Sequence, residues 1–189
     1  MTVDRHIVED CIKGKRRAQN KLYQHFAGGM LGVCLRYSRN LHEAEDILQE
    51  GFIKVFRNIG SLRNVEYLPS WIKTIMINTA ITHLNKNKIR FDEITENNAG
   101  VNEEESDYVI DHVEPEILLE LIQQLPEGYR VVLNLYVFEE LKHKEIAEKL
   151  QISVNTSKSQ LSKARKYLKN KLEENNKVNK VSYRYEQQV

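Results

Sequence analysis

The sequence has few cysteines, no long apolar run and almost no net charge, and each absence narrows the class of protein. Only two cysteines occur among 189 residues, Cys11 and Cys34. A disulfide framework is therefore not expected, and a reduced cytoplasm is the simplest setting. No apolar run approaches the roughly 20 residues that span a bilayer, and residues 1–17 lack the apolar stretch of a secretory signal. We therefore expect a cytoplasmic protein without membrane insertion.

Motifs for catalysis and cofactor binding are also missing. The sequence contains no CxxC pair, no glycine-rich phosphate loop and no pairing of a nucleophile with a base. One alternative is a helical metalloenzyme, but carboxylate-bridged metal bundles use a Glu-x-x-His motif on each of two helices, and the chain supplies no such pair. Its ligands would be Glu43, Asp46, Glu50 and one of His25, His42 or His83. We expect no enzymatic activity, no metal and no cofactor, and we expect the two cysteines to be small core residues rather than a redox switch.

The two signs of charge are unevenly distributed along the chain. Residues 1–90 hold 15 Lys/Arg and 8 Asp/Glu, residues 91–114 hold 9 Asp/Glu and no Lys/Arg, and residues 115–172 hold 10 Lys/Arg and 7 Asp/Glu. Basic surface attracts phosphate, whereas acidic surface repels it. The pattern predicts two basic segments, suited to nucleic acid, on either side of an acidic one.

Helical periodicity dominates, and no segment shows sustained strand-like alternation, so the sequence predicts an all-α fold. Apolar residues recur at steps of three and four over 20–40, 42–59 and 71–86. Pro69 and Ser70 mark the start of the third helix, with the serine as its cap. Each apolar stripe is one-sided, so these helices are expected to pack together in a first domain over residues 1–90. The acidic segment 91–114 predicts a linker.

A second small helical domain is predicted over residues 115–172, followed by a frayed polar tail over 173–189. Proline is tolerated in the first turn of a helix, so Pro115 begins a helix to about Gln124. Further helices are expected at about 127–138, 143–150 and 154–172. The last two, joined by the turn Gln151-Ile152-Ser153, have the layout of a helix-turn-helix, whose second helix enters the major groove. Residues 155–171 hold six Lys/Arg and no Asp/Glu, which favours DNA binding.

Two polar faces of the first domain are candidate surfaces. The helix at 42–59 carries acidic residues opposite its apolar stripe, with an exposed apolar residue beside them, and such a face can dock a basic helix. The helix at 71–86 carries an uncharged polar stripe, Thr74, Asn78, Thr82 and Asn85, that leads into Lys86, Lys88 and Arg90. Amides and hydroxyls beside positive charge suit the recognition of bases next to a phosphate backbone.

Four segments stand in a specific order: AEDILQEGFIKVF (44–56), WIKTIMINTAITHL (71–84), LPEGYRVVLNLY (125–136) and EIAEKLQISVNTSKSQLSKAR (145–165). Together they resemble the extracytoplasmic-function group of bacterial RNA polymerase sigma factors, over about residues 5–172. The resemblance implies a region 2 bundle and a region 4 helix-turn-helix domain joined by the acidic linker. It implies a factor that binds core RNA polymerase and directs promoter recognition and transcription initiation. The implied partners are core polymerase, promoter DNA and an anti-sigma factor.

The resemblance also implies roles for individual residues. The helix over 44–56 would grip the clamp helices of the largest polymerase subunit, through Glu43, Glu45, Asp46, Gln49, Glu50 and Ile53. The minus-ten element would be recognised by Trp71, Asn78, Lys86 and Lys88, and Asn64 in the loop 61–69 would capture a flipped base. The minus-thirty-five element would be contacted by Asn155, Thr156, Ser157, Lys158, Gln160, Lys163 and Lys166. The acidic linker would thread the polymerase along the path that RNA later follows.

One departure from the family pattern has a physical consequence. The family usually has glycine where Gln151 stands, and a left-handed turn there costs a non-glycine residue about 1 kcal/mol. An alternative function is a helix-turn-helix transcriptional regulator with a helical sensor domain. Such a regulator would not need the helix over 44–56, and binding to core polymerase separates the two hypotheses.

Overall fold

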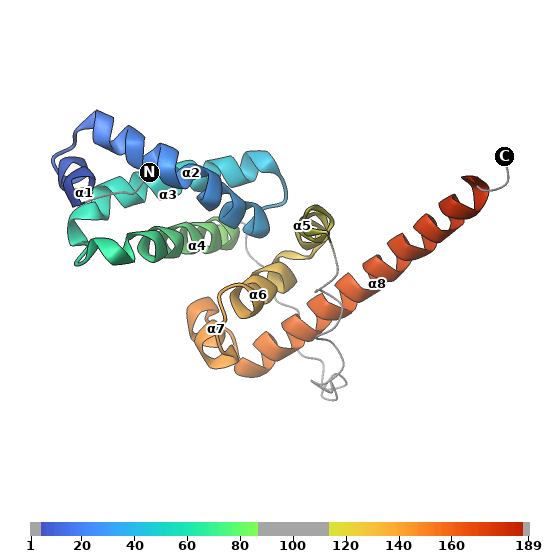
Figure 1. Ribbon diagram of the computed structural model, residues 1–189. Helices are drawn as coiled ribbons and strands as arrows, with labels where there is room; N and C mark the ends of the chain where they lie inside the picture. Colours follow the sequence, from blue (N-terminus) through green and yellow to red (C-terminus); the bar gives the residue numbers. More distant parts are fainter. Residues whose placement is uncertain (1–4, 87–113, 187–189) are drawn as a thin grey trace. The chain divides into compact units, whose positions relative to one another are not determined.

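The chain divides into two compact units, Met1–Ile89 and Arg90–Val189, in the computed structural model (Figure 1). The structure describes residues 5–86 and 114–186. Regular structure in these two ranges is helical, without a strand, which confirms the predicted all-α fold. Most of the acidic segment 91–114 lies outside the described residues.

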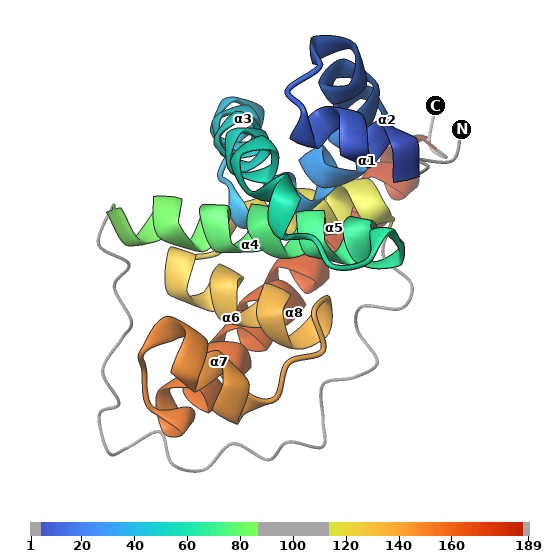
Figure 2. The same cartoon turned by 90° about the vertical axis from the view of Figure 1, so that its left-hand side faces the viewer.

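The first unit is a bundle of helices α1 (Arg5–Ile12), α2 (Arg16–Tyr37), α3 (Leu41–Asn58) and α4 (Leu68–Lys86). Two short 3-10 turns, η1 (Ile59–Ser61) and η2 (Val65–Tyr67), join α3 to α4. Helices α2, α3 and α4 pack on one another in all three pairs, and α1 packs on α2. In Figure 2, α4 runs across the view while α3 is seen nearly end-on. The fully buried side chains at the centre include Leu22, Tyr37, Ala44, Ile47, Val55, Ile72, Met76 and Leu84.

Helices α3 and α4 approach each other closely at Gly51. A Cβ atom added to Gly51 would overlap the side chain of Met76, beginning at its Sδ atom. Met76 has no exposed surface and belongs to the centre of the bundle. The absence of a side chain at Gly51 is therefore what allows α3 to lie this close to α4.

The start of α4 differs from the sequence prediction. The helix begins at Leu68, so Pro69 and Ser70 lie inside its first turn. Ser70 Oγ donates a hydrogen bond to the carbonyl oxygen of Tyr67 at 3.0 Å, and the prediction that Ser70 caps the helix is wrong. The N–H groups in the first turn of a helix have no partner within the helix. Proline, which lacks an N–H, can therefore lie inside this turn, and the helix can begin before Pro69.

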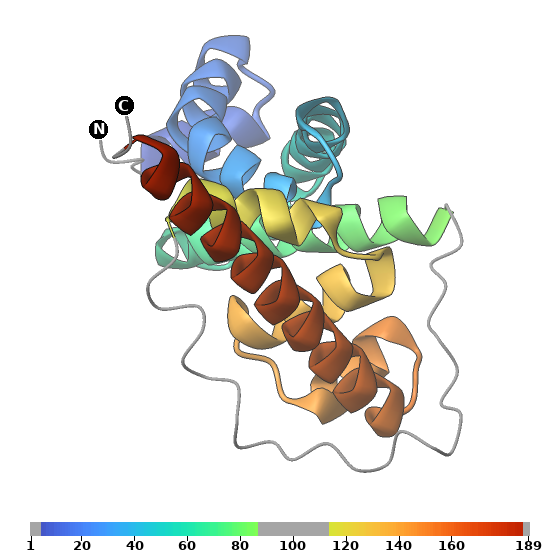
Figure 3. The same cartoon turned by 90° about the vertical axis from the view of Figure 1, so that its right-hand side faces the viewer.

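The second unit contains α5 (Pro115–Gln124), α6 (Glu127–Val137), α7 (His143–Leu150) and α8 (Val154–Glu186). Helices α6 and α7 pack against the N-terminal half of α8 (Figure 3). Arg130 of α6 is fully buried, and its Nη1 atom donates to the carbonyl oxygen of Gln123 at 2.8 Å. This bond satisfies a carbonyl at the end of α5 that has no partner within its own helix.

Helix α8 is longer than predicted. It runs to Glu186, whereas the sequence predicted an end near residue 172 and a frayed tail from 173. That expectation is wrong for residues 173–186. No glycine or proline occurs from Val154 to Glu186, so no residue in this range breaks a helix. An ion pair of 2.8 Å between Lys171 and Glu174 also spans the predicted end.

Candidate functional site

The residues predicted to contact the polymerase lie on three sides of α3. At 100° per residue, Asp46 and Ile53 lie opposite the buried stripe, and both are exposed, Ile53 by 50 %. Glu45 and Gln49 are exposed on the side facing α2. Glu43 and Glu50 lie toward α4. The predicted set therefore divides into an outer pair, a pair beside α2 and a pair beside α4.

Glu43 helps to fix the start of α3. Its backbone N–H donates to the Asn40 side chain at 2.9 Å, and its carboxylate accepts from the Arg39 backbone N–H at 2.7 Å. The carboxylate also lies 3.6 Å from His83 Nε2 on α4, and the Glu43 side chain is only 15 % exposed. These contacts give Glu43 a role in the fold and leave little of its side chain for a partner.

Glu50 belongs to a polar bridge between α3 and α4. Its carboxylate forms an ion pair of 2.9 Å with Lys54 one turn later. Lys54 Nζ also donates to Thr79 Oγ1 on α4 at 3.2 Å, and Thr79 is buried. Glu50 thus orients the lysine that joins the two helices.

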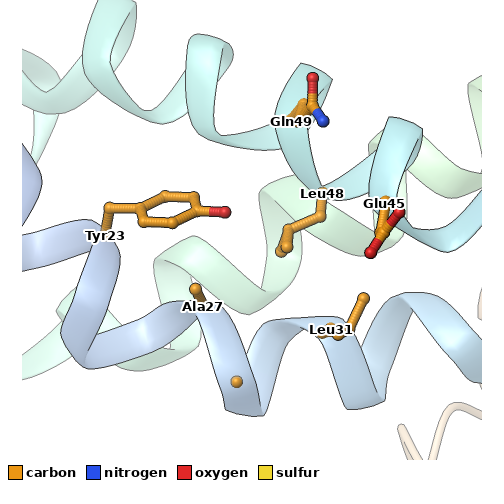
Figure 4. Close-up of a pocket in the computed structure, with 7 residues that line it drawn as sticks. Tyr23, Ala27, Leu31, Glu45, Leu48 and Gln49 are labelled. Atoms are coloured by element: carbon orange, nitrogen blue, oxygen red, sulfur yellow. The ribbon is translucent and has the colours of Figure 1, made fainter.

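A groove lies between α2 and α3 beside the second pair (Figure 4). It has a volume of about 320 Å³, and its lining comprises Glu45, Leu48 and Gln49 of α3 with Tyr23, Ala27, Gly28 and Leu31 of α2. Sequence reasoning missed the contribution of α2. A signal was present, because glycines inside a helix cost about 1 kcal/mol each and α2 contains Gly28, Gly29 and Gly32. A Cβ atom at any of the three would meet nothing within 4 Å, so packing within this unit does not require them.

Beyond its first turn, the exposed residues of α4 up to Leu84 form one narrow stripe. Thr74, Asn78 and Thr82 are exposed at steps of four residues, as the predicted polar stripe requires. The hydroxyls of Thr74 and Thr82 donate to the backbone carbonyls of Ser70 and Asn78, each at 2.8 Å. Asn78 lies between these two threonines, and its amide side chain is at the middle of the stripe.

The remaining residues predicted for the minus-ten element differ in position. Trp71 is half-buried at the start of the stripe. Lys86 is the last residue of α4, and Lys88 lies outside the described residues. Asn64 is exposed and caps η2, because its Oδ1 accepts from the Glu66 N–H at 3.0 Å. Sequence reasoning missed Tyr67, which is 65 % exposed three residues beyond Asn64.

The residues predicted for the minus-thirty-five element divide by burial along α8. Asn155, Lys158 and Lys166 are exposed, while Thr156 and Lys163 are half-buried. Ser157 and Gln160 have no exposed surface, and this placement does not support base contacts for them. They stand four residues before Leu161 and Ala164, on the buried stripe of α8. Helical spacing from those two apolar residues was a signal that could have identified them as core positions, but the sequence prediction placed them among the DNA contacts.

The predicted helix-turn-helix is present, with α7 ending at Leu150 and α8 starting at Val154. Gln151 is left-handed, with φ 55° and ψ 44°, as the family's glycine at this position implied. The backbone N–H of Ile152 donates to the Ala147 carbonyl at 3.0 Å, and Ile152 is half-buried. Ser153 Oγ accepts from the Thr156 N–H at 2.9 Å, so this serine caps the recognition helix.

The alternatives with metal or redox chemistry find no geometric support in the described part of the chain. Among residues 5–86 and 114–186, no three His, Cys, Asp or Glu side chains gather as a metal site would require. Cys11 and Cys34 are buried free thiols, and burial raises the pKa of Cys11 to about 11 and that of Cys34 to about 12. In the same two ranges, no helix combines the length and the apolar character needed to cross a membrane.

Comparison with known proteins yields matches on both helical units. Residues 22–89 match the family model for sigma-70 region 2, and residues 116–168 match the model for sigma-70 region 4. The chain is 34 % identical to the ECF RNA polymerase sigma factor SigW of Bacillus subtilis, over 87 % of this chain and 94 % of that protein. It is 32 % identical to the RNA polymerase sigma-H factor of Pseudomonas aeruginosa, over 86 % of this chain and 90 % of that protein.

A solved structure shares the fold at lower identity. It is the sigma factor RpoE from Bartonella quintana, in complex with the anti-sigma factor NepR, with a TM-score of 0.50 and 18 % identity. The match covers 82 % of this chain and 96 % of that one. The match to sigma-70 region 2 favours the sigma-factor interpretation over a regulator with a sensor domain, because such a regulator has no need of that region.

Proposed function

The chain belongs to the extracytoplasmic-function group of RNA polymerase sigma factors, and we propose that its two helical units divide polymerase binding and promoter recognition between them. The observation that supports this division is the order of the matches: region 2 over 22–89 and region 4 over 116–168 fall on separate compact units. The chain has no catalytic role of its own in this proposal, and it acts in the cytoplasm together with the polymerase.

In the first unit, the exposed side of α3 binds core polymerase. Asp46 and Ile53 form the centre of this contact, with Glu45 and Gln49 at its edge along the groove. An apolar side chain that is 50 % exposed beside carboxylates suits a basic helix that also buries apolar surface. Glu43 and Glu50 support the contact indirectly. The Glu43 carboxylate lies beside His83 of α4, and Glu50 orients Lys54, whose amine donates to Thr79 of α4.

The stripe on α4 contacts the melted minus-ten element. Asn78 offers an amide that can both donate to and accept from a base edge. Tyr67, exposed in the turn before α4, provides a face on which an unpaired base can stack. Trp71 and Asn64 complete the proposed surface, and Lys86 and Lys88, which follow it in the sequence, are proposed to bind phosphate.

In the second unit, the start of α8 contacts the minus-thirty-five element. Asn155 and Lys158 lie in the first turns of the helix, where backbone N–H groups also favour phosphate. Lys166 lies on the same exposed side, with Thr156 and Lys163 at its margins. Ser157 and Gln160 are buried and are not part of this surface.

A protein partner is also part of the proposal. The Bartonella quintana sigma factor was solved with an anti-sigma factor bound, and we extend a partner of this class to the present chain. Capture of the tagged full-length protein from cells in which its promoters are silent is expected to recover an inhibitory protein that leaves when those promoters become active. Recovery of the chain with core polymerase alone under both conditions would contradict this partner.

Reconstituted transcription tests the function itself. Core polymerase from the organism that encodes the chain is incubated with a genomic fragment library, with and without the purified protein, and transcript starts are mapped. We expect starts that depend on the protein and share two upstream sequence elements at a fixed spacing. If no start depends on the protein, the proposed function is wrong.

A further inference from the structure

Four side chains connect α6, α7 and α8 beside the proposed recognition surface. Tyr136 of α6 stacks on His143, the first residue of α7, with ring centroids 4.8 Å apart and ring planes 26° from parallel. His143 Nδ1 lies 2.9 Å from Ser157 Oγ on α8. The guanidinium carbon of Arg165, also on α8, lies 5.6 Å from the centroid of the Tyr136 ring.

Burial makes these contacts stronger than contacts at an open surface. Ser157 has no exposed surface, and a buried hydroxyl requires a hydrogen-bond partner, which His143 supplies. Tyr136, His143 and Arg165 are each half-buried. A hydrogen bond and a cation–π contact both strengthen as water is removed, so the cluster holds α8 more firmly than exposed polar contacts would.

The cluster contacts α8 at two residues, and two contacts constrain the orientation of the helix more than a single contact would. Ser157 and Arg165 are eight residues apart, or about 12 Å along the axis at 1.5 Å per residue. Two such anchors fix both the rotation of the helix and its position along its axis. A rotation of about 20° would move a side-chain end 5–6 Å from the axis by about 2 Å, which exceeds the tolerance of a hydrogen bond.

The exposed candidates for DNA contact are next to both anchors. Lys158 follows Ser157 directly, and Lys166 follows Arg165 directly, both exposed. We propose that Tyr136 and His143 are positioning residues for recognition of the upstream promoter element, acting through Ser157 and Arg165 without touching DNA. This inference rests on the function proposed above, and it adds residues that set the orientation of the recognition helix.

The test uses the full-length protein with core polymerase and a promoter fragment recovered from the genomic library. Transcription is compared on this fragment and on a copy with a scrambled upstream element, and the ratio measures upstream discrimination. His143→Phe keeps a stacking ring but removes Nδ1, Ser157→Ala removes the hydroxyl, and Tyr136→Leu removes the ring. We expect each to lower the ratio about fivefold or more, as expected when one base contact is misplaced. Tyr136→Phe keeps the ring and is expected to preserve the ratio.

A matched core variant separates positioning from stability. Ile146→Val shortens a buried side chain of α7 outside the cluster, and thermal melting of each variant gives its loss of stability. We expect Ile146→Val to keep the ratio even where its melting temperature falls as far as that of Ser157→Ala. An unchanged ratio in Ser157→Ala, or an equal loss in Ile146→Val, would overturn the positioning role. Failure of the wild-type protein to start transcription on any fragment would instead refute the proposed function, and this inference with it.

Discussion

At the scale of single residues, alanine substitution is expected to have opposite effects on stability at Gly51 and Gly28, although both are glycines inside helices. Alanine at Gly51 would overlap Met76, and overpacking of a core costs about 1–3 kcal/mol. Alanine at Gly28 would meet nothing within 4 Å and should stabilise α2 by up to about 1 kcal/mol. Urea denaturation of Gly51→Ala and Gly28→Ala measures both changes. Equal effects of the two substitutions would contradict the close packing of α3 on α4.

The burial of the two thiols predicts slow reaction with thiol reagents and a free energy of unfolding that depends on pH. Burial raises their pKa values from the ordinary 9.0 to about 11 for Cys11 and about 12 for Cys34, so both stay protonated at pH 8 and react slowly. We expect a thiol reagent to label neither cysteine in the folded protein at pH 8 and to label both after unfolding. The unfolded chain loses these protons near pH 9 and the folded chain does not, so the free energy of unfolding falls as the pH rises from about 9 to 12. Rapid labelling of the folded protein would contradict the burial of these thiols.

Asp46 is the residue whose charge tests the proposed polymerase contact. It is exposed opposite the buried stripe of α3, and charge reversal in Asp46→Lys turns attraction to a basic partner into repulsion. We expect binding to core polymerase to weaken about tenfold, or about 1.4 kcal/mol, in a competition assay. Glu9→Lys makes the same charge change on α1 and is the control. A similar loss in both variants would mean that net charge, not this face, determines binding.

Ser157 shows where residue-level prediction from the sequence fails. A polar run at the start of a basic helix indicates DNA contact, yet only the helical phase decides which members of the run face outward. Ser157 lies on the buried side and is satisfied by His143. That partner comes from another helix, and no local pattern indicates a hydrogen bond between residues 14 positions apart.

At the scale of elements, the turn between α7 and α8 stores a small amount of strain. Gln151 has φ 55°, a conformation that costs a non-glycine residue about 1 kcal/mol. We expect Gln151→Gly to raise the free energy of unfolding by up to about 1 kcal/mol, reduced by the greater flexibility of glycine in the unfolded chain. Chemical denaturation of the full-length protein measures the change. A loss of stability would mean that contacts of the glutamine side chain outweigh the strain.

Helix boundaries were predictable where a local signal exists and not elsewhere. Pro115 and Leu125-Pro126 fixed α5 and the start of α6, and the spacing of Ile146, Ala147 and Leu150 fixed α7. Helix α1 and the start of α2 at Arg16 were not predicted, because the first predicted helical range began at residue 20. Two further boundaries were predicted wrongly. Helix α4 starts at Leu68, before Pro69. Helix α8 continues through polar residues to Glu186, because a helix without glycine or proline needs no apolar face to continue.

At the scale of the whole molecule, the sequence predicted the two helical units and their order, whereas surfaces shared by helices required the structure. The groove beside Glu45 depends on how α2 lies on α3, and the positioning cluster depends on three helices meeting. Both combine residues far apart in the chain. Patterns along one helix indicate which side is buried but not which neighbour covers it.

The division of promoter recognition between the two units is tested most directly by combining one protein variant from each unit with an altered copy of each promoter element. Asn78→Ala on α4 and Asn155→Ala on α8 are each assayed in transcription on promoters altered in the minus-ten or the minus-thirty-five element. A residue and a promoter element that contact each other give non-additive losses of transcription when both are altered. A residue and an element that do not contact each other give additive losses. We predict non-additivity for Asn78 with the minus-ten element alone and for Asn155 with the minus-thirty-five element alone. Additive losses in all four combinations, or coupling of either residue to the other unit's element, would contradict the account.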